Sequence, residues 1–187
     1  MPVNDAERFE QVALPHLDAV LRTATALCGR RDEAEDLTQM TFLRALEHFD
    51  TFAPGTHCKA WLCRILRNIW VDRLRHSAVA GIAVLMDEAN AVAVEDGHQD
   101  EIAWSDAHDV LENFSDDQVI RALARLPEDQ RLTLFLTDVE QLSQEEVADI
   151  TGVAVGTVKS RTSRARMTLR RILHDYAREM GFLGTRQ

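Results

Sequence analysis

Apolar residues recur at helical spacing through the first part of the chain. The pattern predicts three helices: one that ends at Gly29, one over residues 32–49 and one over residues 57–76. A loop marked by Pro54-Gly55 separates the last two. Nothing here alternates as a strand does, so this part is expected to be all-α. The expected buried stripes are, in order, Leu14, Leu17, Leu21, Ala24 and Cys28; Ala34, Leu37, Met40 and Thr41; and Trp61, Ile65, Ile69 (or Leu66) and Leu74.

Helical periodicity is lost over residues 77–115 and returns at residue 116. The intervening segment is acidic and is expected to be a linker with at most fragments of helix. Beyond it, Val119 and Leu123 predict a helix that breaks at Leu126-Pro127, and another follows over residues 131–139. The predicted fold is therefore all-α, with two small helical domains, residues 1–76 and 116–187, joined by an acidic linker.

The most informative local signals lie in the second domain. Ser143 and Glu146 have the spacing of a capping box, in which each side chain accepts a backbone N–H at the start of a helix. Gly152 marks a turn, and the small Ala148 lets a second helix cross closely. A short helix, a turn and a longer helix are typical of a DNA-reading helix-turn-helix. The longer helix is expected over residues 155–173, with an inward stripe of Val158, Thr162, Ala165, Leu169 and Ile172.

Charge distribution supports DNA binding by this longer helix. The net charge of -10 argues against it for the whole chain, but residues 77–118 carry 11 acidic side chains and no Lys or Arg. Residues 157–171 hold six basic side chains and no acidic one. An ordinary surface helix is the alternative, yet such helices usually mix both signs. The candidate DNA contacts, whose side chains can donate to bases or phosphates, are Thr157, Lys159, Ser160, Arg161, Ser163, Arg164 and Arg166.

Enzymatic, metal and membrane functions find no support in the sequence. Three cysteines are too few for a disulfide framework and fit a reducing compartment. His57, Cys58 and Cys63 lack the four-ligand spacing of a structural zinc site, so neither a metal nor a cofactor is expected. Nucleotide-binding and nucleophile motifs are absent, as are a secretory signal and an apolar run of ~20 residues. We expect a cytoplasmic protein that is not an enzyme and does not insert into a membrane.

Two groups of motifs resemble the extracytoplasmic-function family of sigma-70 RNA polymerase sigma factors. They stand in the family's order and at its spacing, and together they span most of the chain outside the linker. Residues 126–131, 140–148, 156–161 and 164–166 are similar to sigma region 4, residues 34–45 to region 2.2, and residues 60–68 with 72–75 to regions 2.3 and 2.4.

The resemblance implies a role for each domain. Residues 1–76 would be sigma region 2, which binds core RNA polymerase and recognises and melts the −10 element. Residues 116–187 would be region 4, which reads the −35 element. The candidates for docking on the β′ clamp helices are Asp36, Gln39, Phe42 and Leu43, although Phe42 or Leu43 can instead belong to the core. The candidates for −10 DNA are Lys59, Arg64, Arg67, Asn68, Arg73 and Arg75, while Trp61 is expected in the core.

The expected partners are core RNA polymerase (the β′ clamp helices and the β subunit), promoter DNA and an anti-sigma factor, in a stress response. The acidic linker either threads a basic channel of the polymerase or is a solvated tether. Two other classes are considered. A helix-turn-helix repressor would not need the pattern of residues 36–45, and a sigma mimic that sequesters an anti-sigma factor would not need the basic helix.

Overall fold

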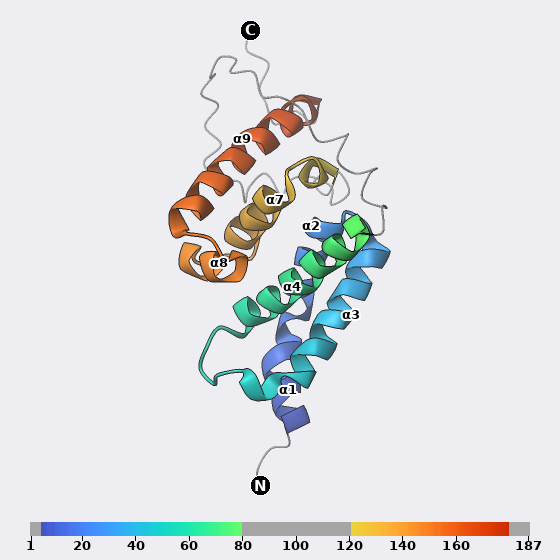
Figure 1. The fold of residues 1–187 in the computed structure, drawn as a ribbon. Helices are drawn as coiled ribbons and strands as arrows, with labels where there is room; N and C mark the ends of the chain where they lie inside the picture. Colours follow the sequence, from blue (N-terminus) through green and yellow to red (C-terminus); the bar gives the residue numbers. More distant parts are fainter. Residues whose placement is uncertain (1–4, 80–120, 180–187) are drawn as a thin grey trace.

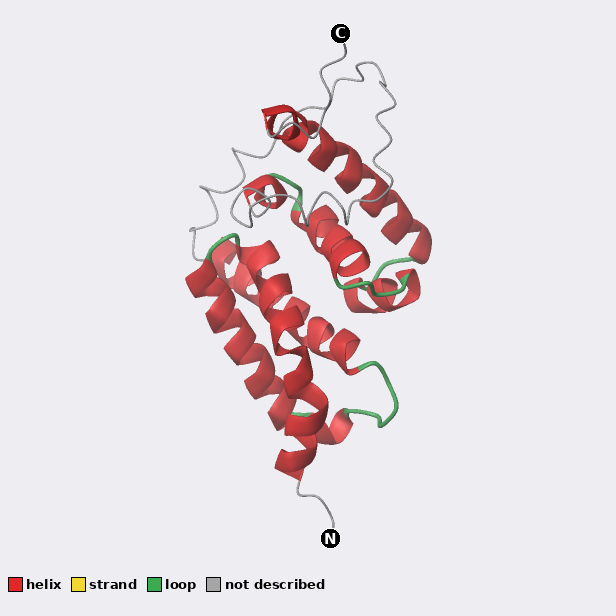
Figure 2. Ribbon diagram, turned by 180° about the vertical axis from the view of Figure 1, so that it is seen from behind, coloured by secondary structure: helices red, strands yellow, loops and turns green. Residues whose placement is uncertain are grey.

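The computed structural model describes residues 5–79 and 121–179, and every regular element in these ranges is helical (Figures 1 and 2). The acidic linker and the predicted start of a helix at Val119 lie outside the described residues. The N-terminal bundle (residues 5–79) comprises α1 (Asp5–Ala13), a 3-10 turn η1 (Leu14–His16), α2 (Leu17–Cys28), α3 (Arg31–Glu47), a 3-10 turn η2 (Phe49–Thr51) and α4 (Cys58–Val79). The C-terminal bundle (residues 121–179) contains α7 (Glu128–Leu134), a π-helix η4 (Phe135–Val139), α8 (Gln144–Thr151) and α9 (Val155–Glu179).

The start of the N-terminal bundle differs from the predicted single helix. The chain passes through the 3-10 turn η1 at Pro15, and a new helix begins at Leu17. Proline lacks a backbone N–H and cannot continue the hydrogen-bond ladder, so the buried face is reset there. Leu14 and Leu17, expected in the core, are 47% and 43% exposed. The predicted end at Gly29 is confirmed, because its φ of 68° gives the left-handed C-cap that glycine allows.

The stripe of α4 is also rotated from its predicted position. Leu62, Leu66 and Trp70 are buried, whereas Trp61 and Ile65 are only partly buried. The reason is that α4 packs against α2 and α3 on one side and α8 on the other, so a broad face is covered. A simple one-sided stripe does not describe such a helix.

The helix-turn-helix forms as predicted. The Ser143 hydroxyl accepts the Glu146 N–H at 3.2 Å, and the Glu146 carboxylate accepts the Ser143 N–H at 2.8 Å, which completes the capping box. Gly152 ends α8 with φ of 69°. The inward face of α9 buries Val158, Thr162, Ala165, Leu169 and, in place of the expected Ile172, Leu173. Before it, the break at Leu126-Pro127 is confirmed, but the expected helix over residues 131–139 widens into η4 from Phe135.

Buried hydrophobic clusters extend across the contact between the two bundles. A single buried cluster contains Leu27 and Leu62 of the N-terminal bundle together with Leu136, Leu142 and Val147 of the C-terminal bundle. In both views α7 lies between α9 and the N-terminal bundle, and α8 lies against α4 (Figures 1 and 2). We call this packing the closed arrangement. The sequence predicts two domains and a linker but not their contact.

Candidate DNA and polymerase interfaces

The recognition helix α9 presents part of the predicted DNA-binding set to solvent. Lys159, Ser163 and Arg164 are exposed. The hydroxyl of half-buried Ser160 donates to the carbonyl of Thr157 at 3.0 Å and lies 3.5 Å from Nη2 of Arg164. Because the buried stripe holds the opposite side of α9 against α7 and α8, these polar side chains form one outward surface. Its donors match those that read base edges and phosphates in a major groove.

Two other predicted DNA contacts are engaged within the C-terminal bundle. Arg166 forms a bidentate ion pair with Asp138 of η4, with donor–acceptor distances of 2.8 and 2.7 Å. The Asp138 side chain is only 5% exposed, so the pair neutralises an otherwise buried charge. Arg161 pairs with Asp129 of α7 at 2.9 Å. These acidic partners lie in α7 and η4, on the far side of α8 in the sequence, so the basic run alone does not reveal the pairing.

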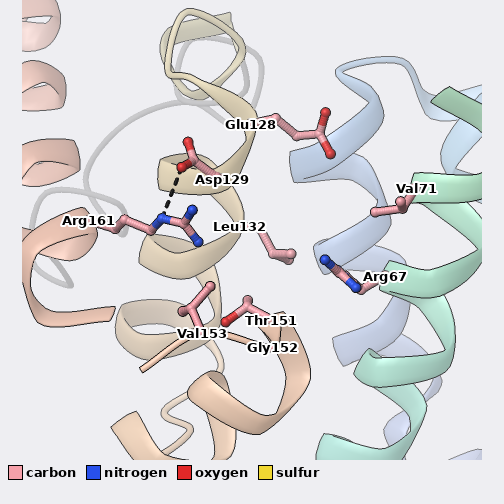
Figure 3. Close-up of a pocket in the computed structure, with 9 residues that line it drawn as sticks. All are labelled: Arg67, Val71, Glu128, Asp129, Leu132, Thr151, Gly152, Val153 and Arg161. Carbon is pink, nitrogen blue, oxygen red and sulfur yellow. Dashed lines mark ion pairs between the residues drawn. The ribbon is translucent and has the colours of Figure 1, made fainter. Parts of the chain in front are cut away.

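Arg161 also lines a cleft of about 570 Å³ between the two bundles (Figure 3). Arg67 and Val71 of α4 enter it from one side, and Leu132 and Asp129 of α7 enter from the other (Figure 3). The closed arrangement therefore brings Arg67, a candidate for −10 DNA, and Arg161, a candidate for −35 DNA, to the same cleft. The remaining lining residues are Glu128, Thr151, Gly152 and Val153.

Trp70 and Glu128 form a hydrogen bond across the bundles. The indole N–H of Trp70 donates to the Glu128 carboxylate at 2.8 Å. Burial raises the pKa of Glu128, and the bond from Trp70 acts against that rise. A partly buried carboxylate that accepts from a partner on the other bundle helps to fix the closed arrangement.

The −10 candidates on α4 fall into two groups. Arg64 and Asn68 are exposed, and so is Arg75, which lies 3.6 Å from Asp72. These side chains lie on solvent-facing parts of α4. The other group faces neighbouring elements: Arg67 lines the cleft, Arg73 lies 3.0 Å from the sulfur of Met40, and Lys59 contacts Glu140 of the C-terminal bundle.

The candidates for polymerase docking lie on α3, and most are exposed. Asp36 and Gln39 are exposed, and Leu43 is 57% exposed. Phe42 differs, because its half-buried ring packs edge-on against Phe9 at 6.3 Å between centroids, which favours a core role.

Sequence reasoning missed two residues of this α3 surface. Met40 and Leu46 are 38% and 48% exposed, each three residues from Leu43, so they extend one apolar strip. The spacing was the available signal, but Met40 was expected in the core. Exposed large apolar side chains in a row are typical of a protein-binding surface.

The aromatic residues and cysteines of the N-terminal bundle support its core. Trp61 packs 5.1 Å from Phe52, between ring centroids, but it is half-buried and packs against the core cluster instead of lying within it. All three cysteines are buried and unpaired, and burial raises the pKa of Cys28 and Cys58 to about 11 and that of Cys63 to about 12. Among the described residues we find no cluster of His, Cys, Asp and Glu that suits a metal ion. Nor does any helix in these ranges have the length and apolar character of a membrane span.

The comparisons with solved structures agree with this helical arrangement. A co-crystal structure of the sigma factor RpoE in complex with the anti-sigma factor NepR from Bartonella quintana matches with a TM-score of 0.70 and 32% identity, over 90% of this chain and 98% of that one. The structure of CnrH in complex with the cytosolic domain of CnrY matches with a TM-score of 0.62 and 25% identity, over 92% and 90% of the two chains.

Sequence comparisons identify the family. The family model for sigma-70 region 2 matches residues 13–79, and that for sigma-70 region 4 matches residues 116–169. The chain is 37% identical to the ECF RNA polymerase sigma factor EcfG of Rhodopseudomonas palustris, over 97% of this chain and 93% of that protein. It is 30% identical to SigW of Bacillus subtilis, over 91% of each. It is 35% identical to SigE of Mycolicibacterium smegmatis over 91% of this chain but only 63% of that longer protein. The chain therefore belongs to the extracytoplasmic-function family of sigma-70 RNA polymerase sigma factors, which are transcription initiation factors and not enzymes.

Proposed function

We propose that the chain binds core RNA polymerase and directs initiation at promoters by reading a −35 element with α9 and a −10 element with α4. The observation that carries this proposal is the exposed polar surface of Lys159, Ser163 and Arg164 on the second helix of a capped helix-turn-helix. The apolar strip of α3 around Leu43 is the proposed docking surface for the β′ clamp helices. Because a coiled-coil partner offers mixed apolar and polar side chains, it suits such a strip.

The proposed domain roles follow the same division. The first domain, residues 1–76, engages polymerase and the melted −10 strand, for which the exposed Arg64, Asn68 and Arg75 are the accessible contacts. Residues 116–187 read duplex −35 DNA. We propose residues 77–115 as the acidic linker between the two domains, with residues 77–79 also forming the end of α4.

An anti-sigma factor is proposed as a further partner. Both matching structures are complexes: RpoE with the anti-sigma factor NepR, and CnrH with the cytosolic domain of CnrY. The likeness in fold extends over at least 90% of this chain in both cases. We infer that a protein of this kind holds the present chain inactive until a stress signal releases it.

The test is a pull-down of core RNA polymerase by the full chain, followed by run-off transcription from a promoter library. Retention of polymerase and initiation at a defined set of promoters are expected. The matched variant is Lys159→Gln with Arg164→Gln, which should keep polymerase binding but lose −35 selection. A chain that binds duplex DNA as a dimer without polymerase would instead be a repressor. A chain that binds only an anti-sigma protein would be a sigma mimic.

A further inference from the structure

Arg22 and Lys59 converge on one carboxylate although they lie on different helices of the N-terminal bundle. Nε of Arg22 on α2 lies 3.1 Å from Oε1 of Glu140, and its Nη2 lies 3.4 Å from Oε2. Nζ of Lys59 on α4 lies 3.7 Å from Oε2 and also donates to the backbone carbonyl of Glu140. Glu140 belongs to the C-terminal bundle and follows η4 directly. The N-terminal bundle thus offers two cations to an anion that comes from the other bundle.

Burial is strongly asymmetric at this contact. The Glu140 side chain is 2% exposed, whereas that of Arg22 is 54% exposed and that of Lys59 is 22% exposed. A carboxylate this deeply buried is tolerated only because both cations bind it. The cations belong to the surface of the N-terminal bundle and are covered there by Glu140. They would face solvent together if the bundles moved apart.

The surroundings of Glu140 on the N-terminal bundle are electropositive. His16 lies beside the site, and its pKa is lowered first by burial and then by Lys59 and His57. Glu140 is the one neighbour that raises the pKa of His16. Without Glu140, the permanent charges of Arg22 and Lys59 would lose their shared counterion, and such a pair of cations favours the arrival of another anion.

We propose that Arg22 and Lys59 form an anion site, occupied by Glu140 in the closed arrangement and by a backbone phosphate of single-stranded DNA when the bundles separate. Both occupants present paired acceptor oxygens, which a guanidinium binds in a fork and an ammonium supports as a point charge. The identity of the second occupant rests on the proposed −10 role of Lys59. Arg22, which no motif singles out, thereby becomes a further DNA contact.

Mutual exclusion follows from this site. Glu140 and a phosphate cannot occupy the same cations, so binding of the DNA strand and closing of the bundles oppose each other. His57 with Glu146 and Trp70 with Glu128 hold the same closed arrangement from neighbouring positions. These contacts favour the closed arrangement. The DNA strand can shift the population toward the open form only because it binds the open form more tightly.

Two measurements on the full chain test the proposal. The first is the radius of gyration from small-angle X-ray scattering, with no DNA or polymerase present. Glu140→Gln keeps the side-chain shape but leaves both cations without a counterion, and an increased radius is expected. The second is the affinity for a fluorescent mixed-sequence 12-nucleotide single-stranded DNA. Glu140→Gln should bind it at least about tenfold more tightly, because losing one partner of a buried charge pair weakens the closed form strongly.

The controls separate the anion site from a general change of charge. Glu145→Gln removes the same charge from an exposed position of α8 and should change neither the radius nor the affinity. In the Glu140→Gln background, Arg22→Gln should weaken DNA binding and lower the salt slope by about 0.7, the value for one phosphate contact to a single strand. Arg31→Gln removes an exposed arginine of α3 and should change neither the DNA affinity nor the salt slope.

The outcomes are distinct from those of the transcription assay. An unchanged radius together with unchanged DNA affinity in Glu140→Gln would overturn the proposal even if the unmodified chain initiates transcription. DNA binding that ignores Arg22→Gln would overturn the anion site. Excess inorganic phosphate should not displace the strand. Full displacement would show a site for free phosphate instead. If Glu140→Gln lowers the melting temperature too far for these measurements, a double variant replaces it. Arg22→Gln with Lys59→Gln removes the same ion pairs by changing the more exposed partners, and it should also increase the radius.

Discussion

Arg164 and Arg166 lie two positions apart on α9 but have different surroundings. Arg164 is exposed and contacts only Ser160 among the bonds described above, whereas Arg166 is bound to buried Asp138. We predict that Arg164→Ala changes −35 preference and leaves stability within about 0.5 kcal/mol. Arg166→Ala should lower the free energy of unfolding by about 1–3 kcal/mol, because it leaves the Asp138 carboxylate unpaired.

The measurement is a promoter-library transcription assay at two salt concentrations, with urea unfolding of each variant. Arg171→Ala, an exposed cation farther along α9, serves as the control and should weaken binding to all sequences alike. An Arg164 variant with unchanged −35 preference would show that this side chain does not read bases.

Glu146 makes the free energy of unfolding depend on pH in the acidic range. Burial alone would raise its pKa, but bonds from Ser143 and His57 outweigh burial and lower the pKa below the ordinary value of 4.5. A carboxylate with a lowered folded-state pKa stabilises the protein above its unfolded-state pKa, and this contribution is lost as pH falls through the folded-state value. Unfolding free energy should thus drop below pH 4.5, and the drop should be smaller in Glu146→Gln. Urea titrations between pH 3 and 7 (roughly the range over which carboxylates titrate) test this, with Ser143→Ala expected to reduce the same dependence.

Cysteine reactivity is the third prediction at the residue scale. The raised thiol pKa values of about 11 to 12 mean that very little thiolate exists near neutral pH. A thiol reagent at pH 8 (roughly three to four units below those values) should modify the cysteines of the folded chain slowly. After unfolding in guanidinium, it should modify all three cysteines rapidly. Rapid modification of one thiol in the folded chain would contradict this expectation.

At the scale of elements, α3 buries one face in the core and exposes apolar side chains on the other. Leu37 and Thr41 are fully buried on one face, while Leu43 is 57% exposed on the other. Leu43→Ala should weaken the binding of core polymerase without lowering the melting temperature, because an exposed side chain makes few contacts in the free chain. Leu14→Ala, which removes a leucine with 47% exposure outside α3, is the matched control for the pull-down.

Phe42→Ala distinguishes a core role from a docking role. The ring packs against Phe9, so its loss should lower the free energy of unfolding by about 1–3 kcal/mol. A pull-down of polymerase that survives this substitution at low temperature would place Phe42 in the core alone.

The sequence predicts elements with strong local signals and fails where tertiary contacts decide. The capping box at Ser143, the stop at Gly29 and the inward stripe of α9 were all predictable, because each rests on backbone chemistry or a regular period. The π-helix η4 has no comparable local signature. The buried stripe of α4 differs from the predicted one because the second bundle also covers that helix. No local sequence pattern indicates this contact.

The same limit applies to the candidate site. Residue type and charge pointed to seven DNA contacts on α9, but they do not tell Arg164 from Arg166, since the difference lies in a carboxylate 28 positions away in the sequence. Arg22 was missed for a similar reason. It lies among apolar and small residues of α2, and only the tertiary structure shows that it and Lys59 of α4 bind the same carboxylate, Glu140.

At the scale of the whole molecule, the closed arrangement places α7 between α9 and the N-terminal bundle. Arg131, at the start of this contact, is 7% exposed, and its Nη1 donates to the carbonyl of Ala124 at 3.1 Å. Its Nε is buried without a hydrogen-bond partner, and burial lowers the pKa of its guanidinium. An unsatisfied buried donor weakens the arrangement that buries it. The C-terminal bundle therefore contains a local cost at α7, beside its contact with the N-terminal bundle.

The core shared by the bundles has a calorimetric consequence. Since Leu27, Leu62, Leu136 and Val147 belong to one buried cluster, heat should melt both bundles together in a single endotherm whose van't Hoff and calorimetric enthalpies agree. A variant in which the bundles have separated should instead show two smaller endotherms. The bundles form one cooperative unit only when they pack together. The number of endotherms in scanning calorimetry therefore reports whether this sigma factor is closed or open.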